Sequence, residues 1–487
     1  MVGRRAFKMD ESFLEKLAIG AVGARAVLGE LRRQGHRPIE LERGSMDYKI
    51  WKNIKIKRLR VPDLLCLNCG TRVEARAKTQ LEISMSHSVS DSERGWDKGL
   101  SDRDVVALSI CTKTGEGPTD WQANPLIQFV SVASLRRAFA KNRVVSEKPK
   151  GAGEGFELRV TWPSAVASSA GVVSALTAGR LQFKRERDQR TISLALSKKG
   201  ISLEPLVNIG DTVVPGQIIA SVAPVTSALP CSGTCVDSSF LGMLASPAVA
   251  DRYTAAKALS HLHGPAASAA LAERMQDARE HIYVRLEAAA GLARAGETTG
   301  MALIQQTLQD QYLEHRLEAV IILGEIPTDD SRNTLTAVLL DRTQHPEIRA
   351  GAAWALGELQ QAASVDALVQ VFLELSEPIR IEAARALRKI AATGANVVAR
   401  LGAAQEDQRA GIAWAVSRSG CVRIDDVLPL LADDNARGWV AYILGTQDQQ
   451  ACVGQIEQLR RQDPEVYFAV TVLWKILASW IHGLEEY

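Results

Sequence analysis

Two carboxylates, an arginine and a lysine occur close together between positions 63 and 78. Asp63 comes directly after Pro62, and Glu74 follows in the next apolar segment. Arg76 and Lys78 then occupy alternate positions. Neighbouring carboxylates are the ligands that a hard divalent cation such as Mg²⁺ or Mn²⁺ takes. Such a cation polarises a phosphodiester and lowers the pKa of a water molecule, and a nearby lysine positions or deprotonates that water. The stretch therefore predicts metal-dependent cleavage of a phosphodiester.

A β-hairpin is the element that positions these residues. Two apolar half-patterns, at 61–67 and 71–77, lie on either side of the turn signal Asn68-Cys69-Gly70. Side chains two apart on a strand share a face. Glu74, Arg76 and Lys78 are therefore expected on one face, with Asp63 beside them on the neighbouring strand. The alternative is an ordinary hairpin whose charged outer face is solvated.

In these residues the chain resembles the PD-(D/E)xK superfamily, the restriction-endonuclease-like nucleases. Pro62-Asp63 matches the first element of that motif and Glu74 the second. The resemblance implies that Asp63 and Glu74 bind Mg²⁺ or Mn²⁺. The family spacing places lysine at position 76, where this chain has Arg76, and arginine holds its proton too tightly to act as a base. Either Lys78 takes the role of the lysine, with Arg76 stabilising the transition state, or the site is weakened.

The segments before and after the hairpin predict an α/β domain. Residues 10–34 have helical periodicity, 36–44 and 49–57 are candidate strands, and the hairpin follows. This order is the one that the resemblance implies, and Glu15 or Glu30 on the first helix would supply a further acid. Residues 84–103 form a polar loop in this interpretation. Strands at 104–111 and 125–132 and a basic helix at 134–143 complete the expected domain.

A basic strand precedes the acidic residues, although the whole chain has a net charge of only +2. Basic side chains clustered beside a candidate site predict nonspecific contacts with a phosphate backbone. DNA is the expected nucleic acid, and RNA remains open. The candidate contact residues are Lys49, Lys52, Lys55, Lys57, Arg58 and Arg60.

Two cysteines in the hairpin turn have the spacing of a zinc knuckle, Cys66-x-x-Cys69. A structural Zn²⁺ needs four ligands, and the sequence offers no adjacent second pair. Cys231 and Cys235 form another close pair, and Cys111 or His87 are further candidates. The alternative is a hairpin tip that carries two free thiols.

The cysteine count and the termini bear on the compartment. Seven scattered cysteines do not form the even framework of a secreted disulfide protein, and the N-terminus has no apolar signal region. We therefore expect a cytoplasmic protein. Residues 466–484 are apolar but contain Lys475, so a buried terminal helix is expected there rather than a membrane span.

Residues 156–240 are rich in strand patterns and follow a Gly- and Lys-rich linker at 148–155. The segment from Val207 to Gln217 resembles the barrel-sandwich hybrid, or hammerhead, of biotinyl and lipoyl carriers. The Met-Lys-Met sequence of those carriers is missing near 223–227. A small β-module for docking or for nucleic-acid contact is therefore expected, rather than a carrier.

From residue 242 the chain contains an internal repeat. Seven segments begin with arginine and continue with small and apolar residues, as in Arg285-Leu-Glu-Ala-Ala-Ala-Gly-Leu, at about the 30-residue period of a helix pair. They resemble short HEAT repeats of the phycobilin-lyase type, which implies a solenoid with a concave surface for a partner protein. The arginines are expected to bond between repeats, with ligand binding as an alternative. They are Arg252, Arg285, Arg316, Arg349, Arg380, Arg409 and Arg437.

Together these observations predict a multidomain chain: an α/β restriction-endonuclease-like domain at 1–147, a small all-β module at 156–240 and an all-α HEAT solenoid at 242–487. The leading hypothesis is a metal-dependent nuclease acting on DNA, used by analogy in DNA processing or in defence against foreign DNA. The alternative is a non-catalytic nucleic-acid-binding adaptor with a degenerate nuclease fold. In a third hypothesis the β-module and solenoid regulate a separate enzyme.

Overall fold

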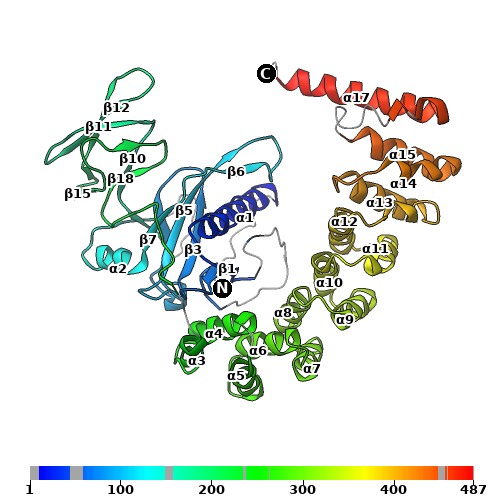
Figure 1. Cartoon of the computed structure of the whole chain (residues 1–487), viewed down its shortest axis with the longest axis horizontal. Coiled ribbons are helices and arrows are strands. Elements are labelled where there is room, and N and C mark those ends of the chain that lie inside the picture. The colour runs from blue at the N-terminus through cyan, green and yellow to red at the C-terminus, as the bar shows by residue number, and fades with distance from the viewer. Residues whose placement is uncertain are drawn as a thin grey trace. The chain divides into compact units, whose positions relative to one another are not determined.

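The computed structural model describes residues 10–43, 46, 59–148, 157–233, 237–262, 264–447, 456, 457 and 459–485. Within it the described residues up to Ala270 form one compact unit, and those from Leu271 onward form a second (Figure 1). Of the predicted basic strand, Lys49, Lys52, Lys55, Lys57 and Arg58 lie outside the described residues, as does Cys235.

The first unit is built on helix α1 (Asp10–Arg33), which confirms the predicted N-terminal helix. α1 packs against the central strands of a mixed sheet. Its apolar side chains Val27 and Leu31 are buried there. At Gly23 the helix backbone touches the sheet directly, since a Cβ at this position would collide with the Cβ of Ala77. α1 therefore lies flat on the strand that carries Glu74.

Six of the described strands form this sheet: β1 (Pro38–Glu40), β2 (Leu64–Cys66), β3 (Arg72–Lys78), β5 (Val105–Lys113), β6 (Trp121–Ala123) and β7 (Gln128–Ser131). β1, β2 and β3 are antiparallel neighbours, and β3 pairs with β5 in parallel. The β2–β3 pairing, with Leu64 opposite Val73, confirms the predicted hairpin. Gly70 closes its turn with a φ of 72°, a conformation that glycine adopts without strain.

Strand β5 separates two hydrophobic cores. Val105 and Ala107 lie in the core under α1, whereas Val106 and Leu108 lie in a larger core on the opposite face. The period of two in a strand produces this division. Both faces are buried along the first part of the strand, which is why β5 is apolar at most positions up to Cys111.

A buried ion pair joins the beginnings of β3 and β5. Arg72 donates two hydrogen bonds to Asp104, with Nε–Oδ1 and Nη2–Oδ2 distances of 2.9 and 2.7 Å. Arg72 also reaches Asp251, at 3.1 Å, on helix α4 (Val249–Leu262). Two parallel bonds hold the guanidinium and the carboxylate in one plane. This contact sets where the two parallel strands start relative to each other.

A three-stranded sheet follows, where the sequence predicted a polar loop. β4 (Ile83–Ser88) pairs antiparallel with β9 (Glu157–Trp162), which pairs with β8 (Val145–Glu147). The loop prediction for 84–103 is therefore wrong at its beginning, because Ile83 and Met85 alternate into the larger core. The short helix η1 (Ser92–Arg94) and loops make up the remainder. The partner strand β9 is distant in sequence, and local patterns do not reveal such a pairing.

Further short strands follow β9 and share the larger core with the main sheet through Val173 and Phe183. They form the groups β10-β18-β16, β13-β12-β11-β17 and β14-β15. Their bounds are β10 (Ser164–Val166), β11 (Gly171–Leu176), β12 (Arg180–Arg185), β13 (Thr191–Ala195), β14 (Ser197–Lys198), β15 (Ile201–Ser202), β16 (Glu204–Pro205), β17 (Thr212–Val213) and β18 (Ile218–Ser221).

Helices dominate the remainder of the chain. In the first unit these are α2 (Val132–Ala140), α3 (Asp237–Met243) and α4, while α5 (Pro265–Gln276) crosses the boundary. The second unit contains α6 (Ile282–Arg294), α7 (Thr298–Thr307), α8 (Leu313–Leu323), α9 (Asp329–Leu340), α10 (Pro346–Leu359), α11 (Val365–Gln370), α12 (Glu377–Ala391), α13 (Glu406–Ser417), α14 (Ile424–Val427), α15 (Asp434–Gly445) and α17 (Pro464–Glu485). Short turns η2 (Ala362–Ser364), η3 (Val371–Leu373), η4 (Val398–Arg400) and η5 (Leu428–Ala432) lie among them.

Neighbouring helix pairs of the second unit stack in chain order (Figure 1). α10, for example, packs on α8, α9 and α12. At the α10–α12 contact a Cβ on Gly357 would lie 2.7 Å from the Cα of Ala386. The small residues of the repeat therefore allow close helix approach, as their sequence pattern predicts.

The recurrent arginines bond between successive helices. Arg349 donates from Nε to the Leu339 carbonyl at the end of α9, at 2.7 Å, and binds both oxygens of Glu374 at 2.7 and 2.6 Å. Arg285 donates to the Met275 carbonyl, and Arg409 to that of Leu401, both at 3.0 Å. Carbonyls at helix ends lack partners within their own helix. The arginines satisfy them, which confirms the predicted structural role at these positions.

The C-terminal helix α17 agrees with the predicted terminal helix. Val466, Val470 and Trp474 are buried, and α17 packs on α15. Among the described residues, no helix is both long enough and apolar enough to span a membrane.

Arg349 should stabilise the second unit strongly, because it is only 5% exposed and its carboxylate partner is also largely buried. Replacing Arg349 with alanine leaves Glu374 and a helix-end carbonyl without their donor, which should cost about 2–4 kcal/mol of unfolding free energy. Arg380 has the same place in its repeat but is exposed, so Arg380→Ala should change stability by about 0.5 kcal/mol or less. Urea unfolding followed by helical circular dichroism measures both, and equal losses would contradict the structural role.

Candidate functional site

Asp63 and Glu74 lie side by side on the β2–β3 hairpin. Asp63 immediately precedes β2, and the backbone N–H of Ala75 donates to its Oδ2 at 2.7 Å. The Asp63 carbonyl accepts from the backbone N–H groups of Leu41 and Glu42, at 2.7 and 3.3 Å, which holds the segment after β1 against the hairpin. The structure therefore brings together the two acids that the sequence predicted.

Burial and mutual repulsion disfavour charge on these acids. Burial is the main cause that raises the pKa of Asp63 well above its usual value, and the charges of Glu74 and Glu42 raise it further. Burial also raises the pKa of Glu74, against the lowering effect of Arg76 and Arg60. Glu42 was not singled out from the sequence, and neither Glu15 nor Glu30 is among the charges that shift the pKa of Asp63 or Glu74. Glu15 binds Lys113, and Glu30 binds Arg33.

Arg76 occupies the position that the family motif gives to lysine, and it binds Glu74. The distance between Arg76 Nη2 and Glu74 Oε1 is 2.7 Å, and the arginine side chain is 41% exposed. Its Nε is buried and has no hydrogen-bond partner within the described part of the chain. The guanidinium thus faces solvent at one end and neutralises one of the two acids at the other.

Of the six basic residues predicted to contact nucleic acid, Arg60 alone falls in the described ranges. It is exposed, and its Nη1 donates to the Gly95 carbonyl at 3.2 Å. Its charge lowers the pKa of Glu74, so it lies near the acid pair. A phosphate at the acids would therefore meet the positive charges of Arg60 and Arg76.

Lys78 lies at the far end of β3, in a different environment. Four residues of extended strand separate it from Glu74, or about 13 Å. Its Nζ donates to the Ser84 carbonyl at 3.1 Å and to the Ser84 hydroxyl. Lys78 lines a cavity of about 660 Å³ together with Lys16, Arg159, Lys198 and Glu82. The side chain therefore belongs to a basic cavity and not to the acid pair.

Burial lowers the pKa of Lys78 to about 8, and the positive charges of Arg159 and Arg76 lower it further against the effect of Glu82. A lysine that loses its proton near neutral pH is a suitable general base or a pH-sensitive contact for a phosphate.

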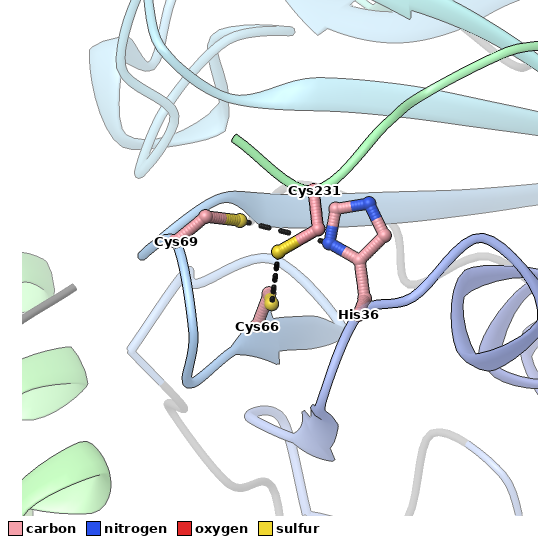
Figure 2. A group of neighbouring side chains, drawn as sticks. All are labelled: His36, Cys66, Cys69 and Cys231. Atoms are coloured by element: carbon pink, nitrogen blue, oxygen red, sulfur yellow. Dashed lines mark hydrogen bonds between the residues drawn. The ribbon is translucent and has the colours of Figure 1, made fainter. Parts of the chain in front are cut away.

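A second group of reactive side chains lies at the tip of the same hairpin. We call His36, Cys66, Cys69 and Cys231 the Cys₃His cluster; one nitrogen or sulfur atom from each lies within 4.8 Å of the others. His36 follows α1, Cys66 ends β2 and Cys69 lies in the turn. Cys231 arrives from the segment after β18 (Figure 2).

The cluster adds Cys231 and His36 to the predicted pair Cys66 and Cys69. The sequence analysis did not place either residue beside that pair. Cys231 was considered only as half of another pair, and His36 was missed. The other candidates lie elsewhere: Cys111 is within hydrogen-bonding distance of the Ile19 carbonyl, and His87 accepts from the Trp96 N–H. The one sequence signal for His36 is its place directly after the first helix, which alone does not indicate a ligand.

Within the cluster, the two hairpin thiols share a proton unequally. A hydrogen bond from the Cys66 thiol lowers the pKa of Cys69 to about 4, and the same bond raises the pKa of Cys66. The hydroxyl of Thr71 also lies 3.2 Å from Cys69 Sγ. The turn therefore favours a thiolate at Cys69.

Lys78 should make stability depend on pH. Its folded-state pKa of about 8 lies below the usual value of 10.5, so the charged amine destabilises the folded state below pH 8. That cost is relieved as the pH rises from about 8 to about 10.5. The stability of Lys78→Met relative to wild type should therefore fall as the pH rises from 7 to 10. Urea unfolding at several pH values tests this, with the exposed Lys184→Met as control. A pH-independent difference would contradict it.

The family match to known proteins lies in the helical part of the chain. A family model for HEAT repeats matches residues 300–388, which run from α7 to α12. A search of curated proteins found no match. The match does not extend to the acid pair or to the Cys₃His cluster.

Several solved structures resemble part of the chain. Human deoxyhypusine hydroxylase in complex with glycerol is 19% identical and covers 49% of this chain and 94% of its own, with a TM-score of 0.22. The complex of CpcE and CpcF of phycocyanin lyase from Nostoc is 16% identical, and the match covers 50% of this chain and 96% of the other, with a TM-score of 0.25. Kap121p bound to Pho4p is 14% identical, and the match covers 47% of this chain and 28% of the other, with a TM-score of 0.28. The family match confirms HEAT repeats at residues 300–388 within an all-helical C-terminal region.

Proposed function

We propose that the first unit cleaves phosphodiester bonds of nucleic acid with a divalent cation held by Asp63 and Glu74, and that the HEAT repeats bind a protein partner. The pairing of the two carboxylates is the observation that carries the proposal. Both carboxylates are largely buried, which raises the pKa of each. Repulsion from Glu74 raises the pKa of Asp63 further. A bound cation would remove this repulsion, so the site would gain stability on binding one.

The donor atoms fit Mg²⁺ or Mn²⁺, which prefer oxygen ligands. One oxygen of Asp63 accepts from the Ala75 N–H, and one oxygen of Glu74 binds Arg76. Within the described residues, the second oxygen of each carboxylate makes no hydrogen bond. Glu42 lies close enough for its charge to raise the pKa of Asp63, so it is a candidate third ligand.

The arrangement of the elements also supports the proposal. α1, β1, β2 with Asp63 directly before it, and the Glu74-bearing β3 follow one another in the order that the PD-(D/E)xK resemblance implies. The cation would supply Lewis-acid polarisation of the phosphodiester and a water of lowered pKa. Arg76 keeps its proton and would stabilise negative charge developing on the phosphate, with Arg60 contacting the backbone. Lys78 would contact a phosphate further along the strand from its own cavity.

A specific observation favours a second candidate, a protein that binds nucleic acid without cutting it. The ion pair between Arg76 and Glu74 neutralises one acid, and arginine replaces the lysine of the motif. If the pair holds in the presence of Mg²⁺, Glu74 contributes little to metal binding. The unit would then act as an adaptor beside the HEAT repeats, whose extended surfaces suit a protein partner.

Isosteric variants test the acid pair. Asp63→Asn and Glu74→Gln keep side-chain size and remove the negative charge, so each should lower Mg²⁺- or Mn²⁺-dependent cleavage of plasmid, linear or single-stranded DNA by about 100-fold or more. DNA binding at low salt should persist in both variants. Unchanged cleavage in both would show that these acids are not the site, and RNA substrates assayed in parallel identify the preferred nucleic acid.

Arg76→Lys separates the two candidate functions. Lysine at position 76 restores the family spacing and, with its lower pKa, can position or deprotonate water, so the nuclease proposal expects cleavage to rise at least several-fold. The control is Arg180→Lys on the exposed start of β12, which should leave cleavage unchanged. If neither wild type nor Arg76→Lys cuts DNA while both bind it in a salt-dependent manner, the adaptor candidate is correct.

A further inference from the structure

We propose that the Cys₃His cluster binds one structural Zn²⁺ through His36 Nδ1 and the sulfurs of Cys66, Cys69 and Cys231. The ion would fasten the segment that follows the β-rich region to the hairpin that carries the acid pair. This proposal stands independently of nuclease activity, because none of its ligands belongs to the acid pair.

Distances between the candidate ligands match a tetrahedral site. With Zn–S bonds of about 2.3 Å and a Zn–N bond of about 2.0 Å, neighbouring ligand atoms lie about 3.5–3.8 Å apart. The Cys69 Sγ–His36 Nδ1 distance is 3.6 Å, and Cys66 Sγ and Cys231 Sγ are 4.0 Å apart. The four ligand atoms all lie within 4.8 Å of one another, so the widest of these separations would contract by at most about 1 Å to close a tetrahedral shell.

The histidine is oriented as a zinc ligand. His36 Nε2 donates its proton to the Leu229 carbonyl at 2.6 Å, which leaves the lone pair of Nδ1 facing the cysteines. Metal-bound histidines commonly donate their second ring N–H to a carbonyl or carboxylate in this way. His36 is also buried, so the ring has little freedom to turn away.

The donor set selects the class of metal. Three thiolates and an imidazole suit Zn²⁺, whereas Mg²⁺ takes oxygen ligands. Four ligand atoms this close together fit a single ion, because the ligands of an iron–sulfur cluster bind separate iron atoms. A Cys66–Cys231 disulfide would use two of the four side chains. It would not explain why Cys69 and the buried His36 lie beside them.

The contacts around Cys231 show what the ion would hold. Thr226 exchanges two backbone hydrogen bonds with Phe129 on β7, at 2.7 and 3.0 Å. The Gln34 side chain bonds the Ser227 carbonyl at 2.9 Å and also accepts from the Leu229 N–H. The chain thus returns along the end of α1 and reaches the hairpin at Cys231. A zinc ion there would close a loop of more than 150 residues between Cys69 and Cys231, and its binding free energy would contribute to folding.

Metal analysis of the untagged full chain, purified without chelator, tests the proposal. Wild type should contain about one zinc per chain, and Cys231→Ser and Cys66→Ser should lose most of it. Cys111→Ser, a buried thiol of the same unit outside the cluster, should keep the wild-type content. Asp63→Asn and Glu74→Gln should also keep their zinc, which separates this result from the nuclease assays.

Cobalt substitution keeps the test decisive if a cysteine variant fails to fold. Wild type exchanged with Co²⁺ should show the visible bands of a tetrahedral site and near-ultraviolet thiolate-to-cobalt absorption. Chelator treatment should then increase proteolysis between β18 and α3. The proposal is overturned if reduced wild type takes up neither Zn²⁺ nor Co²⁺, if it contains iron instead, or if Cys66 and Cys231 form a disulfide in the native protein.

Discussion

The pairing of Arg72 with Asp104 is the interaction on which the first unit depends most. A guanidinium and a carboxylate that are both buried must be matched closely, because an unpaired charge at this depth would cost several kcal/mol. The pair determines where β3 begins relative to β5 and so fixes the register of their parallel pairing. Two residues further along β3 stands Glu74, whose pKa the charge of Asp104 helps to raise. The geometry of the acid pair therefore follows from a contact that takes no part in its chemistry.

Both candidate sites use the same hairpin in different ways. The acids lie just before β2 and within β3, whereas Cys66 at the end of β2 and Cys69 in the turn belong to the Cys₃His cluster. Asp63 and Cys66 are three residues apart, so the segment between them belongs to both environments. A hairpin of this length is only marginally stable alone. Contacts from α1, from β5 and from the returning segment at Cys231 hold it from several directions, which suits an element that must present charged groups at fixed positions.

Sequence patterns predicted the features that depend on near neighbours. The helix at 10–33 and the β2–β3 hairpin follow from patterns within a short window, and the arginine repeat follows from a short motif that recurs about every 30 residues. The β4–β9 pairing and the convergence of His36 and Cys231 on the hairpin turn were not predictable, because each joins residues far apart in sequence. Alternation correctly placed Lys78 on strand β3. The sequence pattern does not show that its side chain contacts Ser84 and lines a cavity with Arg159 instead of joining the acid pair.

The contact between Gly23 and Ala77 has a consequence for how this protein can diverge. Helix α1 contacts β3 at a point where a larger side chain at either position would clash. Position 77 also lies between Arg76 and Lys78. A larger side chain at 77 would lift the helix from the strand and disturb the residues on both sides. Positions 23 and 77 should therefore change together during evolution. A glycine in the first helix facing a small residue in the acidic hairpin would identify distant relatives whose overall identity is too low to detect.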